Sequence, residues 1–363
     1  MRALLRVRQF PPPGLQSWAH VERAPPVKLA SLARGGRDGT LIIVDHQIRR
    51  GVDVPRIART MREAIEGWHQ VEGPLQAISE DLAAGRVEGA FDVQADELAS
   101  PLPRSVQFLD GSVYLHHMEK ARAARGASMP ANYKTEPIMY QGASDRFVGP
   151  REAMLFPSEA DEIDYEAEIA VVVDDVPMGT AAADAARHIK LVMLLNDWTL
   201  RAVTKHELPR GFGFLQAKPT SSFGPVAVTL DELGEAWDGE RFKLRVSTAV
   251  NGKVLGNAHA DRDMFFTYPE LIAHACRTRD LTAGTIIAAG AISNQDPSTG
   301  HGCLAEVRIA EASEGGEATT PWLRFGDVVK VDALDSSGTS VLGTIDQVVA
   351  RAPSPAERAV TGV

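Results

Sequence analysis

The amino-acid sequence predicts an α+β fold, mostly β, in which a small N-terminal α+β domain precedes a larger strand-rich domain. Short apolar runs with β-branched residues recur between Gly- and Pro-containing turns over residues 105–351, a pattern typical of sheets. Helical periodicity is confined to a few segments, and two of these come before Gly85. Residues 99–104, Ala-Ser-Pro-Leu-Pro-Arg, have the composition of a linker between the two domains.

Composition restricts the class of protein. The 363 residues are 44% hydrophobic and 24% charged, with a formal net charge of -10 at pH 7. An acidic chain without a basic stripe is not expected to bind nucleic acid, and no apolar run approaches the ~20 residues of a membrane helix. Cys276 and Cys303 have neither metal-site nor disulfide spacing, so we expect a reducing, cytoplasmic setting.

Residues 1–26 differ from the rest of the chain, because they are rich in Arg and Pro and poor in acids. An Arg-rich start is typical of a transit peptide, but its prolines oppose an amphipathic helix. No apolar core of signal-peptide length is present, so export is not expected. We predict a flexible extension here, and a frayed tail over residues 352–363.

The small domain is expected over residues 27–100. Residues 27–32 and 40–44 have strand character and are joined by Gly-containing turn residues, which predicts a β-hairpin. Residues 57–67 and 74–84 have helical periodicity, with Gly85 as a stop signal.

In the larger domain, residues 163–173 predict one strand that runs into a β-branched block. Alternation places Glu166 and Glu168 on the same face of that strand. Residues 190–198 are apolar on both faces and predict a buried strand that ends at the pair Asn196-Asp197. Residues 268–277 predict a helix.

Acidic side chains stand at predicted strand ends or turns in apolar surroundings, at Asp110, Glu166, Glu168 and Asp197. Oxygen-only ligands suit a hard cation such as Mg²⁺, Ca²⁺ or Mn²⁺. The alternative is a set of solvated side chains, because Glu is usually exposed and spacing alone does not bring four acids together. His116 or His117, shortly after Asp110, suits a general base, although surface or hydrogen-bonded core histidines are more common.

Several motifs follow one another in a fixed order: residues 165–170 (YEAEIA), 196–201 (NDWTLR), 216–220 (QAKPT), 290–294 (GAISN) and 324–327 (RFGD). Together they resemble the motifs of the fumarylacetoacetate hydrolase family. The N-terminal domain and residues 139–145 look like the bacterial two-domain branch of that family. The resemblance implies a catalytic domain of mixed β-sandwich or β-roll type that cleaves a C–C bond in a diketo acid.

The resemblance also implies roles for individual residues, each at a position that matches a family motif. The metal ligands would be Asp110, Glu166, Glu168 and Asp197, holding Mg²⁺, with Ca²⁺ or Mn²⁺ as alternatives. The catalytic residues would be His117, its partner Glu306, and Lys218. Substrate contacts would come from Tyr140, Ala291 and an arginine, either Arg125 or Arg122.

This sequence departs from the family on the substrate side of the site. Ala291 stands where many relatives have Thr, and Thr204 and Ser112 stand where the animal enzymes have Gln and Tyr. These departures leave the substrate open within the diketo acids. A decarboxylase or isomerase of a β-keto acid on the same metal site is an alternative, as is a non-catalytic metal-binding protein. The pair His117 and Glu306 favours hydrolysis, because the other reactions need no base to activate water. Relatives are commonly dimers, so we expect a homodimer.

Overall fold

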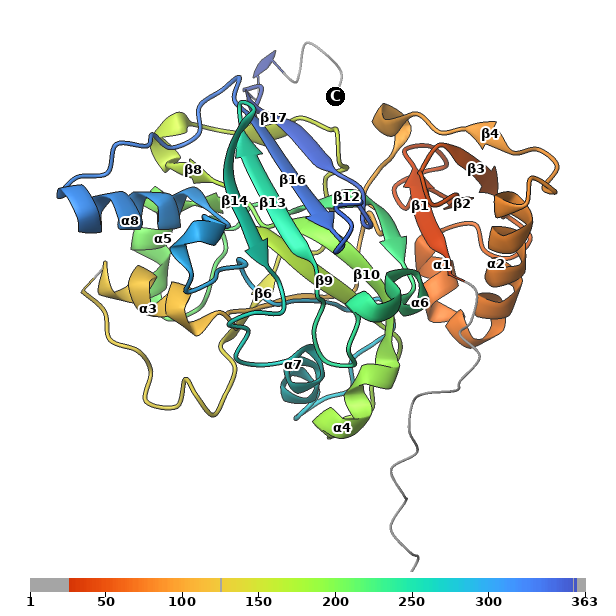
Figure 1. Ribbon diagram of the computed structural model, residues 1–363, viewed down its shortest axis with the longest axis horizontal. Coiled ribbons are helices and arrows are strands. Elements are labelled where there is room, and N and C mark those ends of the chain that lie inside the picture. The colour runs from red at the N-terminus through yellow and green to blue at the C-terminus, as the bar shows by residue number, and fades with distance from the viewer. Residues whose placement is uncertain (1–25, 125, 355, 358–363) are drawn as a thin grey trace, which may run out of the picture.

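The structure is a computed structural model, and it describes residues 26–124, 126–354 and 356–357 (Figure 1). The predicted flexible extension over residues 1–26 lies outside the described residues except for Pro26, and Arg125 lies outside them too. Of the predicted tail over residues 352–363, only residues 352–354 and 356–357 are described.

The described strands form three sheets. The largest has ten strands in the order β4-β3-β2-β1-β12-β10-β9-β15-β5-β6. Its strands are β1 (Lys28–Leu32), β2 (Thr40–Val44), β3 (Arg50–Asp53), β4 (Phe91–Asp92), β5 (Phe108–Gly111), β6 (Met139–Gly142), β9 (Ala167–Val173), β10 (Ile189–Asn196), β12 (Ser222–Val228) and β15 (Ile286–Ala288). The second sheet, in the order β14-β13-β16-β17-β7, consists of β7 (Met154–Phe156), β13 (Arg245–Val250), β14 (Lys253–His259), β16 (Val328–Leu334) and β17 (Ile345–Arg351). The third pairs β8 (Ile163–Asp164) with β11 (Thr199–Leu200).

The helices lie around these sheets (Figure 1). They are α1 (Met61–Glu66), α2 (Trp68–Ala83), α3 (Leu115–Ala123), α4 (Ala182–Ala185), α5 (Arg201–Glu207), α6 (Leu230–Leu233), α7 (Tyr268–Ala275) and α8 (Leu304–Gly315). Short 3₁₀ turns cover Ala95–Glu97, Glu159–Asp161, Ala186–His188, Leu208–Arg210, Gly234–Ala236 and Pro297–Thr299. Helices α1 and α2 flank one end of the molecule, whereas α3, α5 and α8 gather at the opposite end. None of the helices in the described part of the chain has the length and apolar character needed to cross a membrane.

The N-terminal hairpin is continuous with the sheet of the larger domain. Strands β1 and β2 form the predicted antiparallel hairpin, and β1 also pairs with β12 through Lys28↔Val228 and Leu29↔Ala227. Helix α2 begins at Trp68, earlier than predicted, and contains Pro74. It starts there because Gly67 leaves helical geometry and separates α2 from α1. The predicted α+β, strand-rich fold with a small N-terminal domain is confirmed.

The predicted strand over residues 163–173 is interrupted, and the prediction of one continuous strand was wrong. Its two parts are β8 and β9, and the backbone of Glu166 between them pairs with the end of β10. The Glu166 N–H donates to Asn196 Oδ1, and the Glu166 carbonyl accepts from the Asp197 N–H. The buried strand predicted over residues 190–198 corresponds to β10, and the helix predicted over residues 268–277 corresponds to α7.

Both faces of β9 are covered. Ile169 and Val171 belong to the core shared with the five-stranded sheet and α7, whereas Ala170 and Val172 belong to the core shared with α1 and α2. This is the alternation that the sequence predicted. Since both faces are covered, the alternative of a solvated strand end does not apply to Glu168, which is completely buried.

Candidate active site

The topology of the ten-stranded sheet brings the predicted acids together at one end of neighbouring strands. Strand β15 is antiparallel to β9, and β5 runs parallel to β15, so β5 and β15 both run opposite to β9. The ends of β5, β15 and β10 therefore lie beside the beginning of β9. Asp110 is near the end of β5, Glu168 is the second residue of β9, and Asp197 follows β10 directly.

Three of the four predicted metal ligands form one buried cluster. One carboxylate oxygen from each of Asp110, Glu168 and Asp197 lies within 4.8 Å of the other two. Asp110 Oδ1 and Glu168 Oε1 are buried and have no hydrogen-bond partner among the described residues. Burial and the neighbouring carboxylates raise the pKa of Asp110 and of Glu168 well above their usual ranges. The cluster thus concentrates negative charge that the surrounding protein only partly offsets.

Glu166 lies beside this cluster and is held by two cations. Lys218 Nζ is 2.5 Å from Glu166 Oε2 and 2.5 Å from Asp197 Oδ2, so the lysine connects the fourth acid to the other three. Arg201 Nη2 is 2.6 Å from Glu166 Oε1. Burial disfavours the Glu166 carboxylate, but Lys218 and Arg201 outweigh burial and lower its pKa to about 2.

The donor set fits a divalent cation. Carboxylate oxygens are the ligands that Mg²⁺, Mn²⁺ and Ca²⁺ prefer, and two of those present are buried with no hydrogen-bond partner in the described part of the chain. Asp110, Glu168 and Asp197 would hold the ion, with Glu166 next to them. A bound cation would also remove the repulsion that raises the pKa of Asp110 and Glu168.

Backbone and side-chain donors orient the acids. Ser221 Oγ donates to Asp197 Oδ1 at 2.6 Å, and the Tyr140 hydroxyl donates to Asp197 Oδ2. Gly290 N donates to Glu168 Oε2 at 3.1 Å. Gly290 has φ +90, and a Cβ there would collide with the carbonyl oxygen of Gly111. The position next to Glu168 therefore requires glycine.

His117 and Glu306 form a pair next to the acids. His117 lies in the first turn of α3 and Glu306 in the first turn of α8, with His117 Nδ1 2.9 Å from Glu306 Oε1. Ser293 Oγ also donates to Glu306 Oε1, at 2.6 Å. Burial opposes protonation of His117, but the Glu306 carboxylate outweighs burial and raises the histidine pKa. Burial likewise opposes ionisation of Glu306, but His117 outweighs it and holds the Glu306 pKa well below its usual range.

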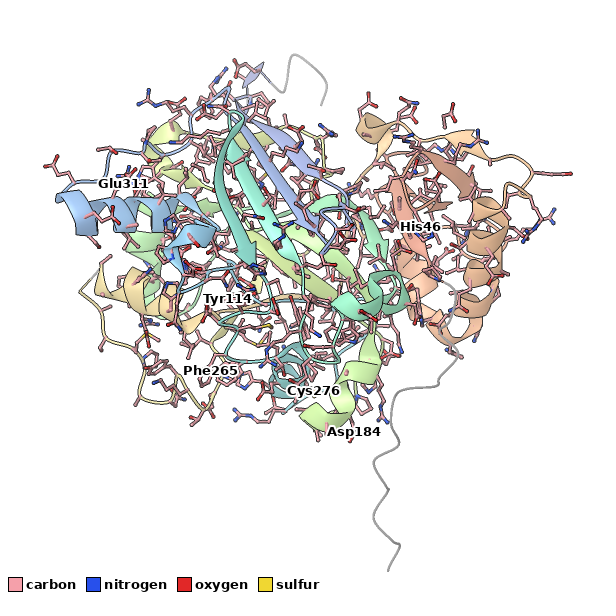
Figure 2. The ribbon with its side chains drawn as sticks, viewed as in Figure 1. His46, Tyr114, Asp184, Phe265, Cys276 and Glu311 are labelled. Atoms are coloured by element: carbon pink, nitrogen blue, oxygen red, sulfur yellow. The ribbon has the colours of Figure 1, made fainter. Side chains whose placement is uncertain are left out.

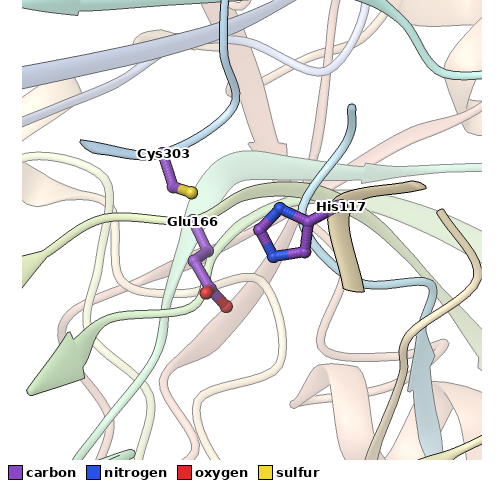
Figure 3. Close-up of side chains that lie close together, drawn as sticks. All are labelled: His117, Glu166 and Cys303. Atoms are coloured by element: carbon purple, nitrogen blue, oxygen red, sulfur yellow. The ribbon is translucent and has the colours of Figure 1, made fainter. Parts of the chain in front are cut away.

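The His117 ring lies beside Glu166. Figure 3 shows His117, Glu166 and Cys303 side by side, and their ligand atoms lie within 4.8 Å of one another. Because Nδ1 faces Glu306, Nε2 is the nitrogen left for proton transfer. His116, by contrast, has Nδ1 3.2 Å from Ser293 Oγ and does not line the cavity described next.

A cavity of about 180 Å³ lies over these groups. The predicted site residues that line it are Asp110, His117, Tyr140, Glu166, Lys218 and Ala291. Glu306 lies behind His117 and does not line the cavity. Arg122 lines it as well, and its Nη1 donates to the Ser128 carbonyl. Figure 2 shows Tyr114, which lies beside the cavity in the interior, and Glu311, which lies far out on α8.

Sequence reasoning assigned no role to Arg201 or Asp164. Arg201 Nε donates to Asp164 Oδ2 at 2.8 Å, and Asp164 also accepts from the N–H groups of Leu304 and Ala305 at the start of α8. The pair thus links Glu166 to the helix that carries Glu306. Arg201 is the last residue of the motif at residues 196–201, and its place in that motif was the one sequence feature that pointed to a role for it.

Comparison with known proteins identifies the family. Residues 107–350 match the family described as fumarylacetoacetate (FAA) hydrolase C-terminal, and residues 27–104 match fumarylacetoacetase N-terminal domain 2. The chain belongs to the fumarylacetoacetate hydrolase family. This is an enzyme family in which a divalent metal is typical, and the acid cluster is the candidate for its metal site.

Curated proteins similar to this chain carry different names. Oxaloacetate tautomerase YisK of Bacillus subtilis is 30% identical over 203 residues, which cover 55% of this chain and 63% of the relative. The mitochondrial oxaloacetate tautomerase FAHD2A of Bos taurus is 29% identical over 159 residues, covering 43% and 48%. An uncharacterized protein of Archaeoglobus fulgidus is 27% identical over 226 residues, covering 58% and 82%.

Solved structures share the fold over most of the chain. A fumarylacetoacetate hydrolase from Exiguobacterium antarcticum matches with a TM-score of 0.60 at 19% identity, covering 90% of this chain and 100% of the other. A maleylpyruvate hydrolase from Sphingobium sp. SYK-6, in complex with a manganese(II) ion and pyruvate, matches with a TM-score of 0.60 at 18% identity and the same coverage. At these identities the likeness shows the fold alone.

Proposed function

We propose that this protein is a metal-dependent hydrolase that cleaves a C–C bond in a 2,4-diketo acid such as an acylpyruvate. The observation that supports this is the 2.9 Å contact between His117 Nδ1 and Glu306 Oε1 beside the acid cluster. A histidine whose second nitrogen faces the cavity is suited to take a proton from water. Glu306 fixes the tautomer and stabilises the protonated ring that results.

The hydrolytic step adds one water molecule across the C–C bond. His117 accepts a proton from that water, and the hydroxide oxygen bonds to the acyl carbonyl carbon. The bond between this carbon and the methylene carbon then breaks, and its electron pair stays with the pyruvate part as an enolate. The enolate takes up a proton at carbon, which leaves pyruvate and a carboxylic acid. A divalent cation held by the acids would polarise the diketo oxygens and offset the enolate charge.

Lys218 and Tyr140 are suited to the enolate half of the substrate. Both line the cavity, and Lys218 Nζ lies 5.7 Å from the centre of the Tyr140 ring. Burial opposes a charge on Lys218, but Asp197 and Glu166 outweigh burial and raise its pKa, so the ammonium stays protonated at neutral pH. We propose that this fixed positive charge stabilises the enolate as it forms. Ala291 lines the cavity with a methyl group where the family resemblance implies a Thr in many relatives, so we propose that another residue contacts the substrate carboxylate.

A direct test measures the cleavage of acetylpyruvate by the full chain. Loss of its enol absorbance, with pyruvate and acetate counted by NMR, measures the hydrolysis. The proposal expects stoichiometric pyruvate and acetate with Mg²⁺ or Mn²⁺, and loss of turnover in EDTA that returns when metal is restored. Turnover that EDTA does not change would overturn the metal mechanism.

A second candidate is an oxaloacetate tautomerase. It is favoured by the names of two relatives that are 29% and 30% identical. The same histidine base would move a proton between C3 and the enol oxygen of oxaloacetate, with no water added. Enol absorbance that decays without pyruvate or CO₂, together with no cleavage of acetylpyruvate, would favour this candidate over the hydrolase.

A further inference from the structure

A second, larger hollow adjoins the cavity of the candidate active site. Its volume is about 580 Å³, and it lies between helices α3, α5 and α8. Four residues, His117, Ala121, Arg201 and Thr204, line both the cavity and this hollow, which we call the helix groove. The helix groove therefore begins at the candidate general base. It extends away from Asp110, Tyr140 and Lys218, which line the cavity alone.

Helix periodicity explains the shape of the helix groove. The residues that line it include His117, Lys120, Ala121 and Ala124 on α3 and its C-cap, and Ala305, Arg308, Ile309 and Ala312 on α8. Each set has the i, i+3, i+4, i+7 spacing of one helix face. Four of these eight side chains are methyl groups, so the two helix faces leave space between them. Ile309 and Trp322 give the helix groove an apolar wall.

The charges in the helix groove are mainly positive, although the whole chain carries a formal net charge of -10. Lys120 and Arg308 have no carboxylate within ion-pair distance among the described residues. Arg308 lies over the Trp322 ring at 4.5 Å and donates to the Thr320 carbonyl. Glu162 is the one carboxylate among the described residues that line the helix groove, and it is 2.8 Å from Lys205. An apolar trough flanked by two cations without counter-ions suits a ligand with a hydrocarbon body and an anionic end.

We propose that the helix groove binds the acyl part of the substrate, an apolar chain that ends in a carboxylate or another anionic group. This inference rests on the proposed hydrolase function, because that function sets the orientation of the substrate in the site. The enolate half lies near Lys218 and the acids, and the attacked acyl carbonyl lies next to His117. The rest of the acyl chain then continues past His117 into the helix groove, toward Lys120 and Arg308.

The first experiment tests binding without any chemistry. Trp322 lines the helix groove, so a ligand there changes its fluorescence. Titration of the full chain with suberate, an eight-carbon dicarboxylate, should give a saturable change that Trp322→Phe removes. The double variant Lys120→Gln/Arg308→Gln should weaken suberate binding about tenfold, since two partly exposed ion pairs are lost. Arg279→Gln is the matched control and should bind as the wild type does, because Arg279 is exposed and lines neither the cavity nor the helix groove.

The second experiment measures selectivity between substrates. Acylpyruvates of equal chain length, one ending in a methyl group and one in a carboxylate, are compared by kcat/KM. We expect the carboxylated substrate to be preferred, and the ratio of the two kcat/KM values to fall about tenfold in Lys120→Gln/Arg308→Gln. Ala312→Trp, which narrows the outer part of the helix groove, should lower the ratio of long-chain to acetyl substrate.

The outcomes separate the two proposals. If acetylpyruvate is cleaved but neither chain length nor a terminal carboxylate matters, the hydrolase stands and the helix groove inference is wrong. If suberate binds as expected but no diketo acid is cleaved, the anionic-chain site stands and the hydrolase is wrong. Suberate that changes Trp322 fluorescence equally in the wild type and in Lys120→Gln/Arg308→Gln would overturn the role of the two cations.

Discussion

Arg201 Nε donates to Asp164 Oδ2 at 2.8 Å, and this buried pair joins the two halves of the candidate active site. Arg201 Nη2 donates to Glu166 Oε1, and Asp164 accepts from the backbone at the start of α8. The acid cluster and the His117–Glu306 pair are therefore held in one hydrogen-bonded frame. A change at either member of the buried pair should affect both halves.

Asp164→Asn should reduce both stability and turnover. The substitution removes a completely buried charge on which Arg201 and two backbone N–H groups depend, and leaving such partners unsatisfied costs about 3 kcal/mol. Chemical denaturation and kcat measure the two effects. Asp92→Asn is the control, because Asp92 forms an exposed pair with Arg50 and should change stability little. Equal effects of the two substitutions would contradict the connecting role of Asp164.

Divalent metal should stabilise the protein, and Asp110→Asn should remove this response. Mg²⁺ or Mn²⁺ binds the folded state and offsets the buried charge, so Tm rises with metal concentration. In metal-free buffer, Asp110→Asn should be no less stable than the wild type, because it removes a buried carboxylate oxygen that has no partner among the described residues. Thermal unfolding with EDTA and with Mn²⁺ measures both. A variant that still gains Tm from Mn²⁺ would contradict the assignment of Asp110.

The metal-free protein should lose stability as the pH rises. Burial and neighbouring acids raise the pKa of Asp110 and Glu168 in the folded state above the usual values of 3.8 and 4.5. Such groups contribute their stability below the unfolded pKa, and it is lost as pH rises through the higher folded pKa. Denaturation in EDTA from pH 5 to pH 8 should show this decline, and saturating Mn²⁺ should suppress it. A metal-free protein whose stability rises over this range would be inconsistent with the buried cluster.

Glu306→Gln should shift the pH profile to lower pH while slowing turnover. Because the Glu306 carboxylate raises the pKa of His117, its loss lets the imidazole deprotonate at lower pH. The acid limb of kcat against pH therefore moves down, whereas kcat itself falls by about 10²-fold or more as the base loses its orientation. Glu314→Gln, on the exposed outer part of α8, is the matched control. A slower enzyme with an unmoved acid limb would contradict this role of Glu306.

Gly290→Ala should destabilise far more than Gly316→Ala. Both glycines have φ near +90, but a Cβ at position 290 meets the Gly111 carbonyl whereas position 316 opens into free space. Backbone strain alone costs about 1–2 kcal/mol, and the collision at Gly290 adds to it. The free energy of unfolding and Mn²⁺ affinity measure the difference, since Gly290 N also donates to Glu168. Similar losses in the two variants would mean that the close approach is not required.

Much of the fold could be predicted because it follows from local periodicity. The alternation in β9 and the apolar run of β10 are properties of a few consecutive residues, and both strands form as expected. The break between β8 and β9 could not be predicted, because it depends on the Asn196 side chain and the Asp197 backbone, which approach Glu166 only in the fold. The same reason explains why Glu166 joins Lys218 and Arg201 rather than the other three acids directly. These contacts depend on how segments distant in sequence pair with one another, and the spacing of residues along the chain does not specify that pairing.

The measurement that tests the hydrolase most directly is isotope incorporation from water. In H₂¹⁸O with Mn²⁺, an acylpyruvate cleaved by the full chain should yield a carboxylic acid that carries one ¹⁸O from the attacking water. His117→Asn should abolish this labelled product while Mn²⁺ still raises Tm, because His117 is not among the three clustered ligands. An enzyme that interconverts oxaloacetate tautomers but releases no labelled acid from any acylpyruvate would contradict the hydrolase.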